Sequence, residues 1–152
     1  MLADPTGMSK PMKKLDDVEA YQLAVDFKRR IYKLVEAHPR ARRDYQYVDQ
    51  LFDAAGGVDS KIAEGWGRFA AAEIRQFLRF ALGSLEEAKR WVVDGIDRGY
   101  FTREECEELL TIGNRCGAAT MAWWRSLGPY VRGPRERPRR NKPRRPGDTP
   151  PR

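Results

Sequence analysis

The stretch KIAEGWGRFAAAEIRQF, residues 61–77, decides how the chain folds, because a helical pattern stops within it and then resumes. Its glycines allow either a ligand-cradling loop or a corner between two packed helices. A phosphate loop needs a strand before its glycines, a helix after them and more glycines than two. Here the preceding segment is helical. We therefore predict a corner in which Gly65 or Gly67 takes a positive φ and Trp66 packs across the end of the bundle. The corner comprises Glu64, Gly65, Trp66, Gly67 and Arg68.

Before this corner, apolar residues recur at three- and four-residue intervals, which is the spacing of one helix face. The pattern predicts a first helix that starts at residue 16 or 17 and a second over about residues 44–65. Pro39 separates them, because the residue before a proline is pushed out of the helical region. The single histidine, His38, is therefore expected at a helix end.

After the corner, the same spacing predicts helices over about residues 71–97 and 102–127. Gly99 is a candidate for the left-handed residue that closes the first of these two. No segment alternates with period two, so the sequence predicts no strands. Four helices joined by short turns predict an all-α, antiparallel up-down four-helix bundle.

Local signals refine these helices. The spacings Asp16-x-x-Glu19 and Thr102-x-x-Glu105 are both typical of a capping box at a helix start. Gly56-Gly57 lies inside the second predicted helix, where each glycine costs up to about 1 kcal/mol relative to alanine. That cost favours a close approach between helices, or a kink.

The net charge of +7 belongs to one end of the chain. Residues 129–152 contain nine Lys or Arg and two Asp or Glu, whereas residues 1–128 contain twenty of each. Seven of the ten prolines also lie in residues 129–152, without apolar periodicity, which predicts a disordered tail. The sequence therefore divides into a flexible arm at 1–14, the bundle at 15–128 and a disordered basic tail at 129–152.

Catalytic and metal sites are not predicted. One histidine and two distant cysteines do not supply the ligand cluster that a metal needs, and no cofactor motif is present. Ser84 has no histidine or lysine placed to activate it. Cys106 and Cys116 lie ten residues apart in one predicted helix, about 15 Å along its axis, which is too far for a disulfide. Free thiols, no export signal and no membrane-spanning apolar run together predict a cytoplasmic protein. The lack of a metal, cofactor or activated-nucleophile motif predicts that the protein is not an enzyme.

The basic tail carries the clearest functional signal. Arginine is a planar bidentate phosphate donor, so a dense run of it favours binding to nucleic acid over a purely solubilising extension. The predicted nucleic-acid-binding residues are Arg132, Arg135, Arg137, Arg139, Arg140, Lys142, Arg144 and Arg145. A secondary basic patch near the first helix corner comprises Arg29, Arg30, Lys33, Arg40, Arg42 and Arg43. In an up-down bundle this patch shares one end with the acidic start of the fourth helix, which partly neutralises it.

Aromatic residues indicate a further surface. Trp123 and Trp124 are adjacent on one helix, so only one ring can face the core. Phe69, Phe80 and Tyr130 also fall outside the predicted apolar stripes. Aromatic side chains left outside a core are typical of partner surfaces, and we expect self-association.

Three segments carry a resemblance to a known family: LDDVEAYQLAVDF (15–27), VDSKIAEGWGR (58–68) and FLRFALGSLEEAKRWV (77–92). They resemble the four-helix bundle proteins encoded by intervening sequences of bacterial large-subunit ribosomal RNA genes. The chain departs from the family at Gly57, Asp59 and Lys61, where serine, proline and asparagine are usual. The segment 109–127, LLTIGNRCGAATMAWWRSL, is similar to the end of the related accessory variability determinant of diversity-generating retroelements.

Both relatives imply a homopentamer with basic surfaces and no enzymatic activity. Together with the tail, the resemblance implies a bacterial, non-catalytic oligomer that binds nucleic acid, with structured RNA favoured. The alternative is an accessory subunit of a reverse transcriptase that bridges the enzyme and its template RNA. No cofactor, metal or membrane partner is implied.

Overall fold

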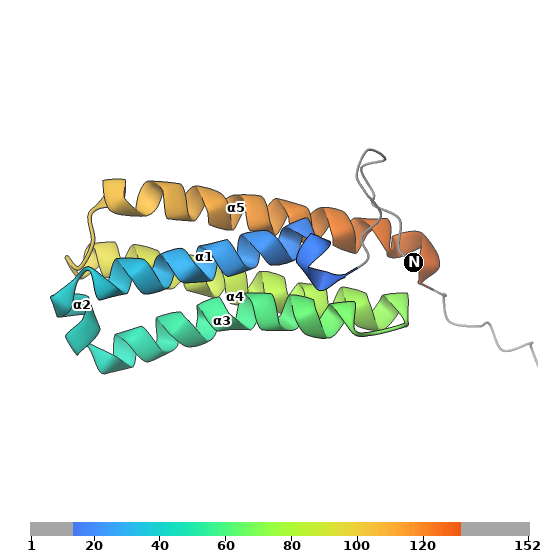
Figure 1. The fold of residues 1–152 in the computed structure, drawn as a ribbon, viewed down its shortest axis with the longest axis horizontal. Helices are drawn as coiled ribbons and strands as arrows, with labels where there is room; N and C mark the ends of the chain where they lie inside the picture. The colour runs from blue at the N-terminus through green and yellow to red at the C-terminus, as the bar shows by residue number, and fades with distance from the viewer. Residues whose placement is uncertain (1–13, 132–152) are drawn as a thin grey trace, which may run out of the picture.

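The computed structural model describes residues 14–131, and these residues form a bundle of four long helices without strands (Figure 1). The predicted all-α bundle is confirmed. Its elements are η1 (Leu15–Asp17), α1 (Glu19–Glu36), α2 (Pro39–Arg43), α3 (Tyr45–Trp66), α4 (Ala71–Asp97), α5 (Arg103–Ser126) and η2 (Gly128–Tyr130). Residues 1–13 and 132–152, which include most of the predicted arm and tail, lie outside the described residues.

The four long helices run alternately up and down (Figure 1). Helix α1 packs against α3 and α5, and α4 packs against the same two helices, so α1 and α4 lie across the diagonal of the bundle. The α1–α3 and α4–α5 connections lie at one end. The α3–α4 corner, the start of α1 and the end of α5 lie at the other, which we call the exit end, because the described chain ends there at Val131 (Figure 1).

The core consists of the apolar stripes of all four helices. Phe27, Ile31, Leu51, Leu78 and Leu85 are essentially inaccessible to solvent. Burying a side chain of this size stabilises a fold by roughly 1.5–3 kcal/mol relative to leaving it exposed. None of the described helices combines the length and the apolarity needed to cross a bilayer.

Two glycines let helices approach closely. A Cβ added at Gly57 would lie 2.8 Å from the Ser84 hydroxyl, so α3 and α4 touch at this point, as the Gly56-Gly57 pattern predicts. A Cβ at Gly95 would lie 2.5 Å from Cε2 of Phe101. It would lie closer still to the Tyr47 hydroxyl, which donates to the Trp91 carbonyl at 2.8 Å. Alanine does not fit at Gly95 without displacing buried rings.

The capping signals near the α4–α5 turn are confirmed. The Thr102 hydroxyl accepts from the Glu105 amide at 3.2 Å, and the Glu105 carboxylate accepts from the Thr102 amide at 2.8 Å. Gly99 has φ +74°, the left-handed conformation expected after the end of α4. Helix α4, Ala71–Asp97, spans the residues that the sequence predicts; Ala70 before it provides no side-chain cap, whereas Gly99 marks its C-terminal end.

Two local predictions are wrong. Helix α1 begins at Glu19 after Val18, so Asp16 does not cap it; Asp16 lies in η1, where its carbonyl accepts from the Gln22 side chain. The prediction that Pro39 ends the first helix is confirmed, since α1 ends at Glu36 and His38, before the proline, is extended with φ −123° and ψ 93°. Pro39 also occupies the first turn of the short helix α2, which was not predicted; that position needs no amide hydrogen.

The second wrong prediction concerns the α3–α4 corner. Neither Gly65 nor Gly67 has a positive φ: Gly65 lies inside α3 and Gly67 has φ −76°. Gly65 is required for space instead, since an added Cβ would lie 3.2 Å from Cβ of Phe77 on α4.

Candidate nucleic-acid interface

The predicted tail residues Arg132, Arg135, Arg137, Arg139, Arg140, Lys142, Arg144 and Arg145 lie outside the described residues. The last described residues determine where this segment begins. After α5, Leu127 is buried and η2 contacts both α4 and α5, which fixes Val131 beside the first turns of α4. Any binding surface that includes the tail therefore starts at the exit end, beside α4 and α5.

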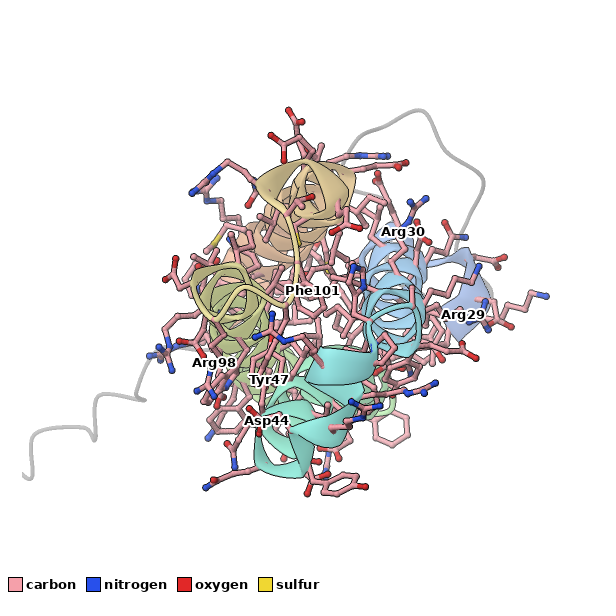
Figure 2. All side chains as sticks on the ribbon, turned by 90° about the vertical axis from the view of Figure 1, so that its left-hand side faces the viewer. Arg29, Arg30, Asp44, Tyr47, Arg98 and Phe101 are labelled. Atoms are coloured by element: carbon pink, nitrogen blue, oxygen red, sulfur yellow. The ribbon has the colours of Figure 1, made fainter. Side chains whose placement is uncertain are left out.

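The secondary basic patch is only partly available. Arg30 donates to Asp26 at 3.0 Å and to Glu108 at 3.1 Å, and the Asp26 hydrogen bond is the main reason that its pKa is raised. Arg40 points to the Gly99 carbonyl and lies over the Tyr100 ring. Arg29 lies on the outer side of α1 (Figure 2), where it borders a pocket with two carboxylates. Lys33, Arg42 and Arg43 are exposed and form no ion pair within residues 14–131.

The end of the bundle near this patch is held by a polar network on Asp44. Its carboxylate accepts from the Tyr47 amide at 3.2 Å, from the Tyr100 hydroxyl at 2.6 Å and from Arg98 at 3.2 Å. Figure 2 shows Asp44, Tyr47 and Arg98 gathered where α3 begins and α4 ends. The Tyr100 hydrogen bond, followed by those of Tyr47 and Arg98, lowers the pKa of Asp44. This network ties three helix ends together, so we assign it to the fold.

The predicted corner, Glu64 to Arg68, is a structural corner with one cationic side chain. Trp66 packs edge-on to Trp123 with ring centroids 6.2 Å apart, as predicted for a ring across the end of the bundle. Glu64 pairs with Lys61 at 3.5 Å. The Arg68 guanidinium lies 4.7 Å from the centroid of the Phe77 ring, and no described carboxylate pairs with it. Arg68 is therefore the corner residue that remains free to meet an anion.

The sequence analysis missed a larger basic surface beside this corner. The Arg75 guanidinium lies 3.7 Å from the centroid of the Trp124 ring, an arrangement in which the ring quadrupole attracts the cation. Arg79 follows one turn later on the same exposed side of α4. Neither arginine forms an ion pair with a described carboxylate.

These residues line a half-open pocket of about 590 Å³ between α4 and the end of α5. We call it the exit pocket; its walls include Arg75, Gln76, Arg79, Phe80, Trp124 and Val131. Among residues 14–131, no group of three or more His, Cys, Asp or Glu side chains is placed to hold a metal ion. The spacing of Arg75, Arg79 and Phe80 along the sequence places them on one side of a helix, which could have indicated a basic and aromatic surface. Only the packed structure brings Trp124 to this surface.

The sequence profile described as 23S rRNA-intervening sequence protein matches residues 16–121, well over half of the chain. The chain belongs to this family. The resemblance of segments 15–27, 58–68 and 77–92 to such proteins is thereby confirmed. The similarity of segment 109–127 to the retroelement accessory protein stays a prediction. A comparison with curated proteins gave no match.

The family match ends at residue 121, and residues on both sides of this position line the exit pocket. Arg75, Arg79 and Phe80 lie within the matched residues, whereas Trp124 and Val131 follow them. Family membership therefore accounts for the bundle, and the pocket must be interpreted from its own residues.

Proposed function

We propose that this 23S rRNA-intervening sequence protein is a non-catalytic, homo-oligomeric bundle that binds nucleic acid, with structured RNA favoured, through its basic tail and the adjoining face of α4. The preference for RNA over DNA rests on the family resemblance together with the basic tail. No cofactor is required by this proposal.

The observation that carries the proposal is where uncompensated positive charge lies. Residues 14–131 hold 18 Lys or Arg against 19 Asp or Glu, whereas residues 132–152 hold nine against two. The excess begins just after Val131, which borders the exit pocket beside Arg75 and Arg79. The tail therefore leaves the bundle next to Arg75 and Arg79, which form no ion pair with a described carboxylate. A phosphate backbone that contacts one would be close to the other.

Self-association would strengthen such binding. A single short basic segment binds phosphates weakly, but several tails on one scaffold raise the effective concentration of each for the same RNA. The exposed side chains of Phe69 and Tyr130 offer apolar area for contacts outside the bundle core. We propose a homopentamer on the strength of the family resemblance.

The test is the salt dependence of binding to a fluorescein-labelled RNA hairpin, measured by anisotropy. Three proteins are compared: the full chain, a chain that ends at Val131, and a full chain with Lys33, Arg42 and Arg43 replaced by glutamine. Ending at Val131 keeps Leu127 and η2 in place. The plot of log affinity against log salt should become shallower by about 0.7–0.9 for each phosphate that the truncated chain no longer neutralises.

The glutamine variant removes three charges from the opposite end of the bundle and should change the slope much less than truncation does. Equal affinity and equal slope for the full and truncated chains would rule out the tail as the contact surface. Light scattering with and without the RNA reports the oligomer, and a monomer in both conditions would rule out the multivalent part of the proposal.

A further inference from the structure

The exit pocket combines arginine side chains that form no ion pair with a described carboxylate and aromatic rings that line the same space. Its volume of about 590 Å³ lies within the range of roughly 300–1,000 Å³ typical of small-ligand sites. Its walls come from α4, the end of α5 and Val131, so the fold positions them before any ligand arrives.

Arg75 is held in one orientation. Trp124 supports its guanidinium from one side at 3.7 Å, which fixes the plane of the donors. The Arg75 Nε atom and the Trp124 Nε1 atom are buried and have no hydrogen-bond partner among the described residues.

Another part of the pocket lining is the ring of Phe80, which contacts the ring of Phe77. Phe80 is 49% exposed and lies edge-on to Phe77, with ring centroids 6.1 Å apart. Phe77 in turn lies beneath the Arg68 guanidinium. Arg79 adjoins Phe80 in sequence and lines the same pocket. An exposed ring beside two free cations is suited to a ligand that has both a flat face and a negative charge.

We infer that the exit pocket binds one nucleotide of a single-stranded RNA segment, with its phosphate at Arg75 and Arg79 and its base against Phe80. This inference rests on the proposed function and deepens it, because it assigns a site on the bundle that is distinct from the tail. A base within a duplex is stacked on both faces and cannot lie on Phe80, so the pocket selects unpaired RNA. Stacking on aromatic side chains tolerates any base, so sequence preference is weak.

The experiment compares two fluorescein-labelled probes, a ten-residue oligoadenylate and a ten-base-pair blunt RNA duplex, on the full chain and three variants. Phe80→Ala removes the exposed ring. Arg79→Gln removes one cation of the pocket. Arg90→Gln is the matched control, because Arg90 also lies on α4 beside a tryptophan ring, 4.9 Å from the centroid of Trp91, but does not line the pocket.

Phe80→Ala should weaken oligoadenylate binding at least about fivefold and leave duplex binding within about twofold, since stacking acts only on unpaired bases. Arg79→Gln should make the salt dependence for oligoadenylate shallower by about 0.7. Arg90→Gln should bind both probes as the unmodified chain does. A chain that ends at Val131 should bind both probes more weakly and keep the Phe80→Ala ratio.

Oligoadenylate affinities for Phe80→Ala and Arg79→Gln equal to that of Arg90→Gln would overturn the inference. The proposed function would then stand as long as the full chain bound the hairpin through its tail. Binding of neither probe nor the hairpin by the full chain would overturn both. A loss of affinity accompanied by a lower mass in light scattering would assign the pocket to contact with a second copy of the chain, and this would also overturn the inference.

Discussion

Gly95→Ala is the substitution for which the packing gives the sharpest expectation. The Cβ that alanine adds would lie 2.5 Å from Cε2 and 2.8 Å from Cδ2 of Phe101, distances that real Cβ atoms do not adopt. It would also meet the Tyr47 hydroxyl, which the Trp91 carbonyl holds through a 2.8 Å hydrogen bond. Tyr47 and Phe101 are almost fully buried, so neither ring can swing into solvent.

The magnitude follows from three contributions. Overpacking a well-filled core costs about 1–3 kcal/mol. Displacing the Tyr47 hydroxyl from its acceptor adds about 1 kcal/mol. Alanine gains up to about 1 kcal/mol over glycine in helix propensity, which offsets part of this. We expect Gly95→Ala to lower the free energy of unfolding by about 1–3 kcal/mol, a fall in Tm of about 4–12 °C for a domain of this size.

Gly83→Ala is the control. Gly83 lies in the same helix, is exposed, and has no atom within 4 Å of an added Cβ. The substitution should therefore raise stability by about 0.5–1 kcal/mol through helix propensity alone. Thermal unfolding is followed by far-ultraviolet circular dichroism at one protein concentration, because oligomerisation changes apparent stability. A Gly95→Ala protein as stable as the unmodified chain, or shifts of the same sign in both variants, would refute the packing argument.

Two further predictions follow from the shifted pKa values of Asp44 and of the two cysteines. Tyr100, Tyr47 and Arg98 hold the pKa of Asp44 below its ordinary value of 3.8, so its contribution to stability is complete above that value and is lost as the pH falls through the lowered pKa. The Tm advantage of the unmodified chain over Asp44→Asn should therefore shrink between about pH 5 and about pH 2, and a constant gap would contradict this. Burial raises the pKa of the Cys106 and Cys116 thiols to about 11. A thiol reagent at about pH 8 should label neither cysteine quickly in the folded protein and both at once after denaturation; rapid labelling of either folded thiol would be inconsistent with its burial.

The long helices could be predicted because their signals are local. Thr102 and Glu105 lie within one turn of each other, and Gly99 lies two residues after the end of α4, so the end of α4 and the start of α5 are each encoded by a few adjacent residues. The apolar spacing of α3 and α4 needed no knowledge of their partners, since a period near 3.6 is a property of one helix.

What could not be predicted depends on residues far apart in the chain. The sequence predicts that the acidic start of the fourth helix partly neutralises the basic patch, but not that Arg30 and Glu108 are the residues that pair. Gly65 is needed for space beside Phe77 rather than for a turn, and this is visible only when α3 and α4 are packed. The exit pocket requires Trp124 to lie against Arg75, which no spacing along the sequence reveals.

An even number of antiparallel helices brings both ends of the described chain to the same end of the molecule (Figure 1). An affinity handle joined directly to residue 14 or residue 131, or a sensor chip that captures it, would therefore lie at the end of the bundle where the RNA is expected to bind. Spectroscopic labels and immobilisation chemistry belong instead at exposed positions of α2, such as Arg42, where the opposite end of the bundle leaves the exit pocket unobstructed.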